Sequence, residues 1–313
     1  MLAVRIHQYG NRDALSLDDI PVPDIQPDEV LVKVVAASVN PVDWKVREGY
    51  LAQMIPHPLP LTLGWDVSGV VTAVGSAVSG WQPGDAVFSR PDLARDGTYA
   101  EFVAIRAVEC ARKPRTVSHA EAASLPLAGI TAWEALVDSA RIQAGQRVLV
   151  HAGSGGVGSL AIQIAKDLGA TVIATTSARN RALVESLGAD HVIDYGSTRF
   201  TEALADNPVD AVFDTLGGQV QDDSWQVLRR GGTLVSIVSP PDQEKARAHG
   251  VHGHFVFIGP NAPVLERLAK MVDGGRLRPV VGAEFGLRDI ARAHELSESG
   301  RAVGKIVLYA GTP

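Results

Sequence analysis

The stretch Arg147-Val-Leu-Val-His-Ala-Gly153-Ser-Gly155-Gly156-Val-Gly158 decides the fold of this chain. Its glycines have the spacing G-x-G-x-x-G. An apolar run precedes them, and an apolar-periodic stretch begins at Leu160. A strand, a tight glycine turn and a helix in this order form the context in which the pattern predicts a dinucleotide site. Glycine lets the backbone approach a pyrophosphate, and the amides at a helix N-terminus bind its charge.

The composition excludes several classes of protein. The chain has 313 residues, 46% of them apolar and 20% charged, with a formal net charge of −6. This charge argues against binding to nucleic acid through phosphates. We see no apolar run long enough to cross a bilayer and no signal peptide at the N-terminus. Cys110 is the one cysteine, so an internal disulfide is impossible. We therefore expect a cytoplasmic protein with no membrane or nucleic-acid partner.

The chain before residue 118 is rich in short strands, which predict a small barrel or sandwich. Prolines and glycine-bearing turns separate them. The expected strands are Leu2–Gln8, Glu29–Val39, Asp66–Val78, Asp85–Ser89 and Thr98–Ile105.

From residue 118 the pattern changes to helices and strands in alternation. A helical stretch, 118–140, is interrupted by Pro126 and Gly129. The alternation that follows predicts an α/β fold, a doubly wound parallel sheet. Its expected strands are 147–151, 171–175, 191–193, 210–213, 232–238 and 254–258. After them we expect helices at 262–273 and 288–299 and strands at 279–281 and 305–309.

Seven segments, in this order, form a recognisable set: Ala37-Ser-Val-Asn40-Pro-Val-Asp43, Gly64-Trp-Asp66-Val-Ser-Gly69, Trp81-Gln-Pro-Gly84-Asp85, Leu127-Ala-Gly129-Ile-Thr131-Ala-Trp133, the glycine stretch, Leu187-Gly-Ala-Asp190-His-Val-Ile-Asp-Tyr195 and Gly304-Lys305-Ile-Val-Leu. With them the chain resembles the medium-chain dehydrogenase/reductase superfamily over nearly its whole length. The nearest group is the zinc-independent NADPH:quinone oxidoreductases and related enone reductases. The resemblance implies a GroES-like domain over 1–118, completed by 262–313, and a Rossmann domain over 119–261. It also implies a homodimer paired through the last strand of the cofactor sheet.

The resemblance also predicts that the protein holds no metal. Zinc-dependent members place a cysteine where this chain has Asn40, and His-Glu where it has Trp65-Asp66. Three or four cysteine or histidine ligands are the minimum for a zinc site. His249, His252 and His254 form the one rival constellation, and we interpret them as part of a polar, glycine-interrupted loop.

The residues around the glycine stretch predict NADPH as the cofactor. We expect Ser154, Gly155, Gly156 and Val157 to line the pyrophosphate. The second strand ends in Thr176-Ser177, where an acidic residue would indicate NAD. Hydroxyl and guanidinium groups follow instead, and these bind a 2′-phosphate. By position in the family motif, the candidates are Ser177, Arg181 and Tyr195. Arg179 is either a further candidate or a solvated charge.

Other candidates lie where strands of the sheet end, because ligands bind at the carboxyl ends of such strands. By resemblance Thr131 borders the nicotinamide, although a helix threonine can also bond its own backbone. The strand-end candidates are Thr215, Val238, Ser239, Phe257 and Ile258, and each could equally belong to the core.

Hydride transfer needs no protein nucleophile, but a hydrogen-bond donor near the acceptor's oxygen would assist it. Asn40 is the leading candidate, although Asn40-Pro41 also reads as a helix N-cap, with Asp43 completing a capping box. Tyr50 and Trp65 are the aromatic candidates for shaping the pocket, and core packing is the alternative for both.

These observations predict an NADPH-dependent reductase of quinones or α,β-unsaturated carbonyls. Two alternatives stay open. One is an enoyl or ketone reductase of a biosynthetic pathway, which a substrate panel would distinguish. The other is a crystallin-like or regulatory protein that binds NADPH without turnover.

Overall fold

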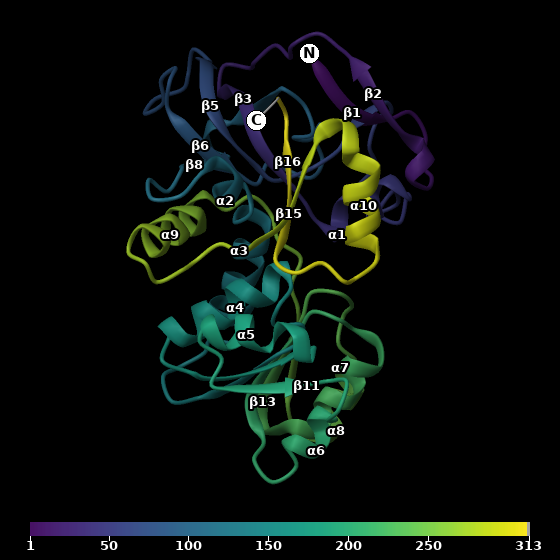
Figure 1. Ribbon diagram of the computed structural model, residues 1–313, viewed down its shortest axis with the longest axis vertical. Coiled ribbons are helices and arrows are strands. Elements are labelled where there is room, and N and C mark those ends of the chain that lie inside the picture. Colours follow the sequence, from purple (N-terminus) through teal and green to yellow (C-terminus); the bar gives the residue numbers. More distant parts are fainter. Residues whose placement is uncertain (312–313) are drawn as a thin grey trace. The chain divides into compact units, whose positions relative to one another are not determined.

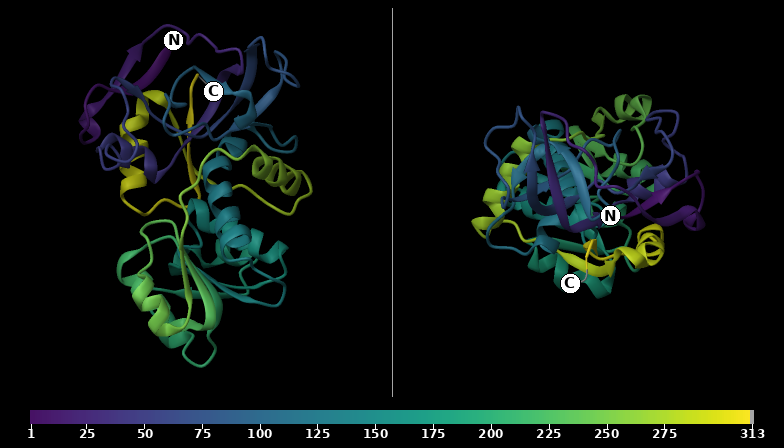
Figure 2. Two further views of the ribbon diagram at one scale, coloured as in Figure 1. Left: turned by 180° about the vertical axis from the view of Figure 1, so that it is seen from behind. Right: turned by 90° about the horizontal axis from the view of Figure 1, so that it is seen from above.

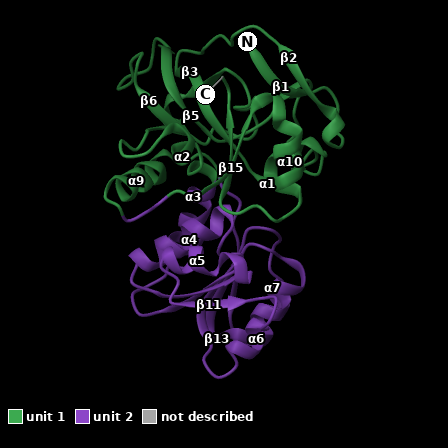
Figure 3. Cartoon of the chain, viewed as in Figure 1, with its two compact units in different colours: residues 1–127, 259–275, 279–313 green, residues 128–258, 276–278 purple. Residues whose placement is uncertain are grey.

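The computed structural model describes residues 1–311, which form two compact units (Figure 3). Unit 1 comprises Met1–Leu127, Gly259–Gly275 and the stretch from Pro279 onward. Unit 2 comprises Ala128–Ile258 and Arg276–Arg278. The domain division at residue 118 stays a prediction, and residues 312–313 of the first domain lie outside the described part.

Unit 1 is built on two sheets (Figure 1). The smaller has the strand order β2-β1-β4, and the larger has the order β15-β16-β3-β5-β6-β8, with β7 also paired to β3. Its strands are β1 (Leu2–Ile6), β2 (Leu15–Asp19), β3 (Glu29–Val39), β4 (Leu61–Thr62), β5 (Val67–Val74), β6 (Ala86–Ser89), β7 (Phe102–Arg106), β8 (Cys110–Arg112), β15 (Val281–Gly286) and β16 (Lys305–Tyr309). Its helices are α1 (Pro41–Arg47), α2 (His119–Ala123), α9 (Ala262–Asp273) and α10 (Ile290–Glu298), with short 3-10 turns at η1 (Arg12–Ala14), η2 (Ala107–Glu109) and η6 (Leu287–Asp289).

The central strand of unit 1, β3, pairs with strands from distant parts of the sequence. It pairs with β5, and its second half pairs antiparallel with β16 from the C-terminal part of the chain, with Ile306 opposite Val39. Figure 2 shows this C-terminal strand, in yellow, among the purple and blue strands of the N-terminal part. Valines 30, 32 and 34 of β3 are buried, whereas Lys33 is exposed, which is the period of two of a strand with one face in the core.

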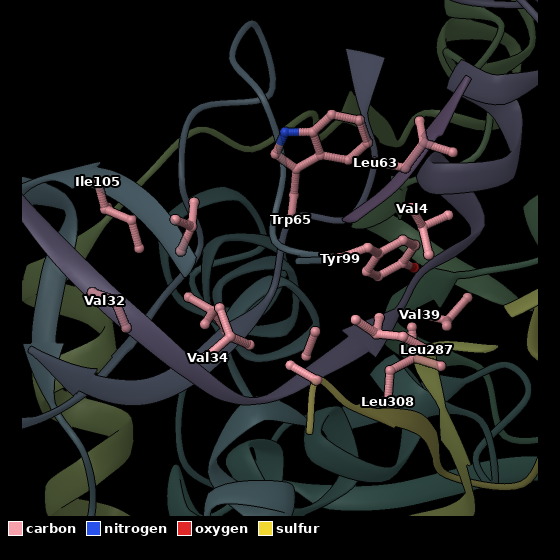
Figure 4. Close-up of a cluster of buried hydrophobic side chains, with 14 of the residues drawn as sticks. Val4, Val32, Val34, Val39, Leu63, Trp65, Tyr99, Ile105, Leu287 and Leu308 are labelled. Atoms are coloured by element: carbon pink, nitrogen blue, oxygen red, sulfur yellow. The ribbon is translucent and has the colours of Figure 1, made fainter. Parts of the chain in front are cut away.

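A hydrophobic cluster fills unit 1 (Figure 4). Trp65 and Tyr99 have no exposed surface, and Val34, Leu63 and Leu308 belong to the same buried cluster. Burying aromatic side chains of this size is a large favourable contribution to folding. The cluster therefore fixes the strand ends and loops that carry the polar residues described below.

Unit 2 is a parallel six-stranded sheet in the order β11-β10-β9-β12-β13-β14, with helices between strands. The strand order reverses between β9 and β12, so the predicted doubly wound α/β fold is confirmed. The strands are β9 (Arg147–Val150), β10 (Thr171–Thr176), β11 (His191–Asp194), β12 (Val209–Asp214), β13 (Leu228–Ser236) and β14 (His252–Phe255). The helices are α4 (Gly156–Asp167), α5 (Arg181–Ser186), α6 (Phe200–Ala203), α7 (Gly218–Ser224) and α8 (Gln243–His249), with 3-10 turns at η4 (Ala178–Asn180) and η5 (Trp225–Val227).

Several predicted element boundaries are wrong. β14 ends at Phe255, so Phe257 and Ile258 follow the strand rather than end it. β13 likewise ends at Ser236, before Val238 and Ser239. The reason is shared: the ladder between β13 and β14 finishes at the pair Ser236–Phe255, and the chain leaves the sheet soon after it in both strands.

The helical stretch predicted over 118–140 consists of three pieces. These are α2, then α3 (Pro126–Trp133), and then a π-helical segment, η3 (Glu134–Ser139). Pro126 starts the second piece because proline lacks the N–H that would continue the first. The short strands β2, β4 and β8 were not predicted. β4 and β8 have only two and three residues, and the residues of β2 are mostly half-buried, so none of the three shows a clear alternation of apolar and polar residues.

No helix within residues 1–311 combines the length and the apolar character needed to span a bilayer.

Candidate functional site

The glycine turn of unit 2 is packed too closely for larger residues. β9 ends at Val150, Gly155 is the N-cap of α4, and the helix begins at Gly156. A Cβ on Gly158 would lie 2.3 Å from the carbonyl oxygen of Ala152. The first turn of α4 therefore rests directly on the backbone of the preceding loop. The leading amides of a helix have no partner within it, so Gly156 and Val157 present the donor groups that a phosphate binds.

A small group of hydroxyl and amide side chains holds Ser154 in this turn. The hydroxyl of Thr176, at the end of β10, donates to Ser154 Oγ at 3.0 Å, and Asn180 Nδ2 donates to the same atom at 3.1 Å. Ser154 and Thr176 are buried. The structure thus brings together two of the predicted residues and adds Asn180, which the sequence analysis missed. Its only signal was an amide a few residues past the end of a strand.

The residues after β10 present cationic groups to solvent. Ser177 is the N-cap of η4, and Arg179 and Arg181 are exposed. Arg181 Nη1 lies 3.4 Å from Oε1 of Glu185, one helical turn away. Tyr195, which follows β11, is 68% exposed. Arg179, Arg181 and Tyr195 are therefore accessible to solvent.

The turns after β12 and β13 are tied together by a buried carboxylate. Asp214 ends β12 and accepts hydrogen bonds from the backbone N–H of Gly217 (2.8 Å), the hydroxyl of Ser236 (2.8 Å) and Gln221 Nε2 (3.0 Å). Gln221 also donates to the carbonyl oxygen of Ser239 at 3.1 Å. The sequence analysis named Ser239 but missed Asp214 and Gln221, because a lone carboxylate at a strand end does not show which amides it meets.

The other predicted residues of unit 2 differ in accessibility. Thr215 donates to the carbonyl oxygen of His151 at 2.9 Å. Thr131 and Ile258 are buried, whereas Val238 and Phe257 are 39% and 50% exposed. Val238 and Phe257 are therefore accessible to solvent, whereas Thr131 and Ile258 are not.

Unit 1 contains a buried polar cluster centred on Asn40 and Asp66. Asn40 Nδ2 donates to Asp66 Oδ2 at 2.8 Å, and Ser38 Oγ donates to the same oxygen at 2.7 Å. The backbone N–H of Leu127 donates to Asp66 Oδ1 at 2.7 Å. Lys305 Nζ donates to Asn40 Oδ1 at 2.5 Å and lies 3.5 Å from Asp66 Oδ2. Burial raises the pKa of Asp66 and lowers that of Lys305, and the attraction between them opposes both shifts.

Asp43 lies beside this cluster and anchors the start of α1. Its Oδ2 accepts from the backbone N–H of Asn40 (2.7 Å) and from the Tyr99 hydroxyl (2.5 Å). Complete burial raises the pKa of Asp43 to about 7, although the bond from Tyr99 acts in the opposite direction. The predicted capping role of Asp43 fits these contacts. The side chain of Asn40, in contrast, is directed to Lys305 and Asp66.

The two aromatic candidates of unit 1 have opposite environments. Tyr50 is 69% exposed and meets the edge of Trp44 with 6.2 Å between ring centroids. Trp65 is fully buried, and its Nε1 donates to the carbonyl oxygen of Arg95 at 3.3 Å. This placement favours the core-packing alternative for Trp65, and its contact with a ligand stays a prediction. Lys45, half-buried with its pKa lowered by burial, lies near Trp44 and was not predicted.

Within residues 1–311, no three or more histidine, cysteine, aspartate or glutamate side chains gather as a metal ion would require. His249 ends α8, whereas His252 and His254 lie on β14. The three therefore do not converge.

Comparison with known proteins agrees with these features. Residues 26–115 match the model of the alcohol dehydrogenase GroES-like domain, and residues 187–308 match that of a zinc-binding dehydrogenase. The NADPH-dependent alkenal/one oxidoreductase, chloroplastic, of Arabidopsis thaliana is 40% identical over 96% of this chain and 77% of its own length.

Solved structures show the same fold over the whole chain. The quinone oxidoreductase from Coxiella burnetii has a TM-score of 0.93 at 38% identity and covers 99% of both chains. A mycobacterial protein solved in complex with NADPH has a TM-score of 0.88 at 31% identity, covering 99% of this chain and 100% of its own. The chain is therefore an oxidoreductase of the medium-chain dehydrogenase/reductase family.

Proposed function

We propose that this protein is an NADPH-dependent reductase that transfers a hydride to quinones or α,β-unsaturated carbonyl compounds. The observation that carries the proposal is the turn between β9 and α4. Its helix packs so closely that Gly158 has no room for a Cβ, and Ser177, Arg179 and Arg181 follow the adjoining strand. Relatives named as quinone and alkenal/one oxidoreductases support the substrate class.

The residues of unit 2 fit a phosphorylated dinucleotide. Ser154, Gly155, Gly156 and Val157 would hold the pyrophosphate, with Thr176 fixing Ser154. The 2′-phosphate would be held by Ser177, Arg181 and Tyr195, since guanidinium and hydroxyl groups donate to phosphate oxygens. The remaining contacts proposed in unit 2 are Thr131, Thr215, Val238, Ser239, Phe257 and Ile258. When bound, NADPH supplies the hydride.

In unit 1, Asn40 would donate a hydrogen bond to the acceptor's oxygen, where negative charge develops as its carbon receives the hydride. The exposed ring of Tyr50 would contact a flat, apolar substrate. A proton must also reach the acceptor to complete the reduction.

We also propose that the reaction uses no zinc. Asn40 and Asp66 stand at positions where zinc-dependent members of the family have zinc ligands. The Nζ of Lys305 donates to Asn40 Oδ1 and lies 3.5 Å from Asp66 Oδ2. An ammonium group against these oxygens competes with any cation, and zinc prefers cysteine and histidine ligands. The donor set therefore does not fit a zinc ion.

The test is a kinetic panel with the purified protein. We expect oxidation of NADPH in the presence of 1,4-naphthoquinone or methyl vinyl ketone, unchanged by a zinc chelator. Preference for enoyl thioesters or simple ketones would favour a biosynthetic reductase instead. Tight NADPH binding with no oxidation by any acceptor would show a binding protein and refute the proposal.

We further infer a homodimer paired through β14, the edge strand of the sheet in unit 2. Phe255 on this strand is 42% exposed, and an exposed edge pairs readily with another strand. Sedimentation should show a dimer for the wild type and a monomer for Phe255→Lys. A monomeric wild type would contradict the inference.

A cytoplasmic location stays a proposal, because the Arabidopsis relative is named as chloroplastic. Fractionation of the source cells would test it.

A further inference from the structure

Lys305 is a buried lysine with no role in the reaction described above. It is the first residue of β16, and only 6% of its surface is exposed. Its Nζ donates to the carbonyl oxygen of Val39 at 2.7 Å as well as to Asn40 Oδ1. Burying an ammonium group is unfavourable unless acceptors surround it, and here they come from the end of β3 and from Asp66.

These contacts give the side chain of Asn40 a single orientation. An ammonium group only donates hydrogen bonds, and a carboxylate only accepts them. Asn40 Oδ1 faces Lys305 and Asn40 Nδ2 faces Asp66. Turning the amide over would set its NH2 against the ammonium and its oxygen against the carboxylate, so both attractive contacts would become repulsive.

The partners of Asn40 are themselves fixed. Asp66 accepts from Ser38 and from the backbone of Leu127, and it has no exposed surface. The backbone N–H of Asn40 is bonded to Asp43. The amide is therefore held at both its oxygen and its nitrogen by groups that have no room to move.

The structure assigns Lys305 and Asp66 as a positioning pair that holds the Asn40 amide as a hydrogen-bond donor toward the acceptor molecule, an assignment that rests on the proposed function. The amide nitrogen has two hydrogens, and Asp66 is the acceptor that the described residues supply for one of them. None of the described hydrogen bonds uses the second hydrogen, and it is this one that we assign to the ligand. Lys305 makes no contact with the reacting atoms and acts through Asn40.

This orientation determines what kind of atom can face Asn40. Because the amide oxygen is taken by Lys305, the side chain offers a ligand only an N–H. A carbonyl or quinone oxygen accepts from it, and its acceptor strength grows as negative charge develops on reduction. A ligand group that only donates has no partner there. The pair thus selects for carbonyl and quinone acceptors.

The kinetic test is a cycle of four proteins: wild type, Asn40→Ala, Lys305→Met and the double variant. Turnover of 1,4-naphthoquinone is measured at saturating NADPH. We expect Lys305→Met to lower kcat by roughly tenfold or more, as loss of an oriented oxyanion donor does, with little change in the KM for NADPH. The double variant should be no slower than Asn40→Ala, because Lys305 acts only through Asn40. Losses that multiply in the double variant would overturn the assignment.

Two further variants separate positioning from stability. Lys305→Met leaves Asp66 without its cationic partner in the interior, and this single variant can fail to fold. The double variant Asp66→Asn/Lys305→Met removes both charged groups, so turnover can still be measured in a folded protein. It should fold and still lose turnover. Lys113→Met is the matched control, since Lys113 also donates to backbone carbonyl oxygens of unit 1, but to those of Pro114 and Val117 rather than to Val39 and the side chain of Asn40. It should keep the wild-type kcat.

A spectroscopic measurement tests the positioning without turnover. The side-chain amide of Asn40 gives a pair of ¹H–¹⁵N signals, identified by their absence from Asn40→Ala. In Asp66→Asn/Lys305→Met these signals should shift and broaden as the amide samples both orientations. Unchanged signals would refute the positioning role. A wild type with a fixed amide but no reductase activity would instead refute the proposed function alone.

Discussion

At the scale of single residues, the cofactor preference depends on side chains that follow one strand. Thr176 and Asn180 both bond Ser154, so the hydroxyl of Ser154 is held in the glycine turn. Arg179 and Arg181 lie beyond it and are exposed. Their difference is that Arg181 has Glu185 one helical turn away, which holds its guanidinium near the start of α5.

Arg181→Ala should therefore raise the KM for NADPH by about tenfold or more, the loss expected for a charge-assisted hydrogen bond, while leaving that for NADH nearly unchanged. The measurement is steady-state kinetics with both cofactors. Arg199→Ala, at an exposed arginine paired with Asp223, is the control and should change neither value. Equal effects of Arg181→Ala on the two cofactors would refute the assignment, and an effect confined to Arg179→Ala would move it to that residue.

At the scale of elements, the nucleotide site depends on how closely α4 approaches β9. The approach is possible because Gly153 and Gly158 lack side chains. A Cβ on Gly153 would meet Ala174 at 2.9 Å, and one on Gly158 would meet the backbone of Ala152 at 2.3 Å. A backbone neighbour cannot move aside as a flexible side chain does, so Gly158 is the stricter position.

Gly158→Ala should displace the first turn of α4 and weaken NADPH binding by roughly tenfold or more, with a lower Tm, because overpacking costs about 1–3 kcal/mol. Fluorescence titration with NADPH and thermal unfolding check both effects. Gly286→Ala is the matched control, since a Cβ there meets nothing within 4 Å and its φ is −81°. Wild-type affinity in Gly158→Ala would show that the helix does not form the binding surface.

At the scale of the whole molecule, each unit buries a neutral histidine. His294 in unit 1 bonds Arg47 Nη1 at 3.1 Å, and burial, followed by the charges of Arg47 and Arg12, lowers its pKa from 6.5 to about 3. Burial lowers the pKa of His151 in unit 2 from 6.5 to about 4, although Asp214 acts in the opposite direction. Between these values and 6.5 the unfolded chain binds more protons than the folded one, so stability falls as the pH falls.

His294→Gln should therefore make the free energy of unfolding less dependent on pH between 6.5 and about 3. Asp43 contributes with the opposite sign, because a pKa raised to about 7 stabilises the fold most at low pH, and both proteins retain this residue. Urea unfolding at a series of pH values measures the difference. His249→Gln, at an exposed histidine, should leave the wild-type profile unchanged. Parallel profiles for His294→Gln and wild type would contradict this account.

The fold class and much of the cofactor site follow from local pattern. Glycine spacing between a strand and a helix predicts the turn at 153–158, because the requirement for a missing Cβ is local. The sequence left two alternatives for Trp65, core packing and pocket contact, because the burial of both Trp65 and Asp66 depends on tertiary contacts. The strand ends at Ser236 and Phe255 were missed because each depends on its neighbour in the sheet.

The sequence by itself determined a two-part α/β chain with a glycine turn suited to a dinucleotide, since helix, strand and turn signals arise between residues close along the chain. Only the tertiary structure decided that Lys305 meets Asn40, 265 positions earlier in the sequence. That contact exists because β16 pairs antiparallel with the end of β3. Pairing between distant strands depends on the packing of the whole unit, and no local pattern encodes it.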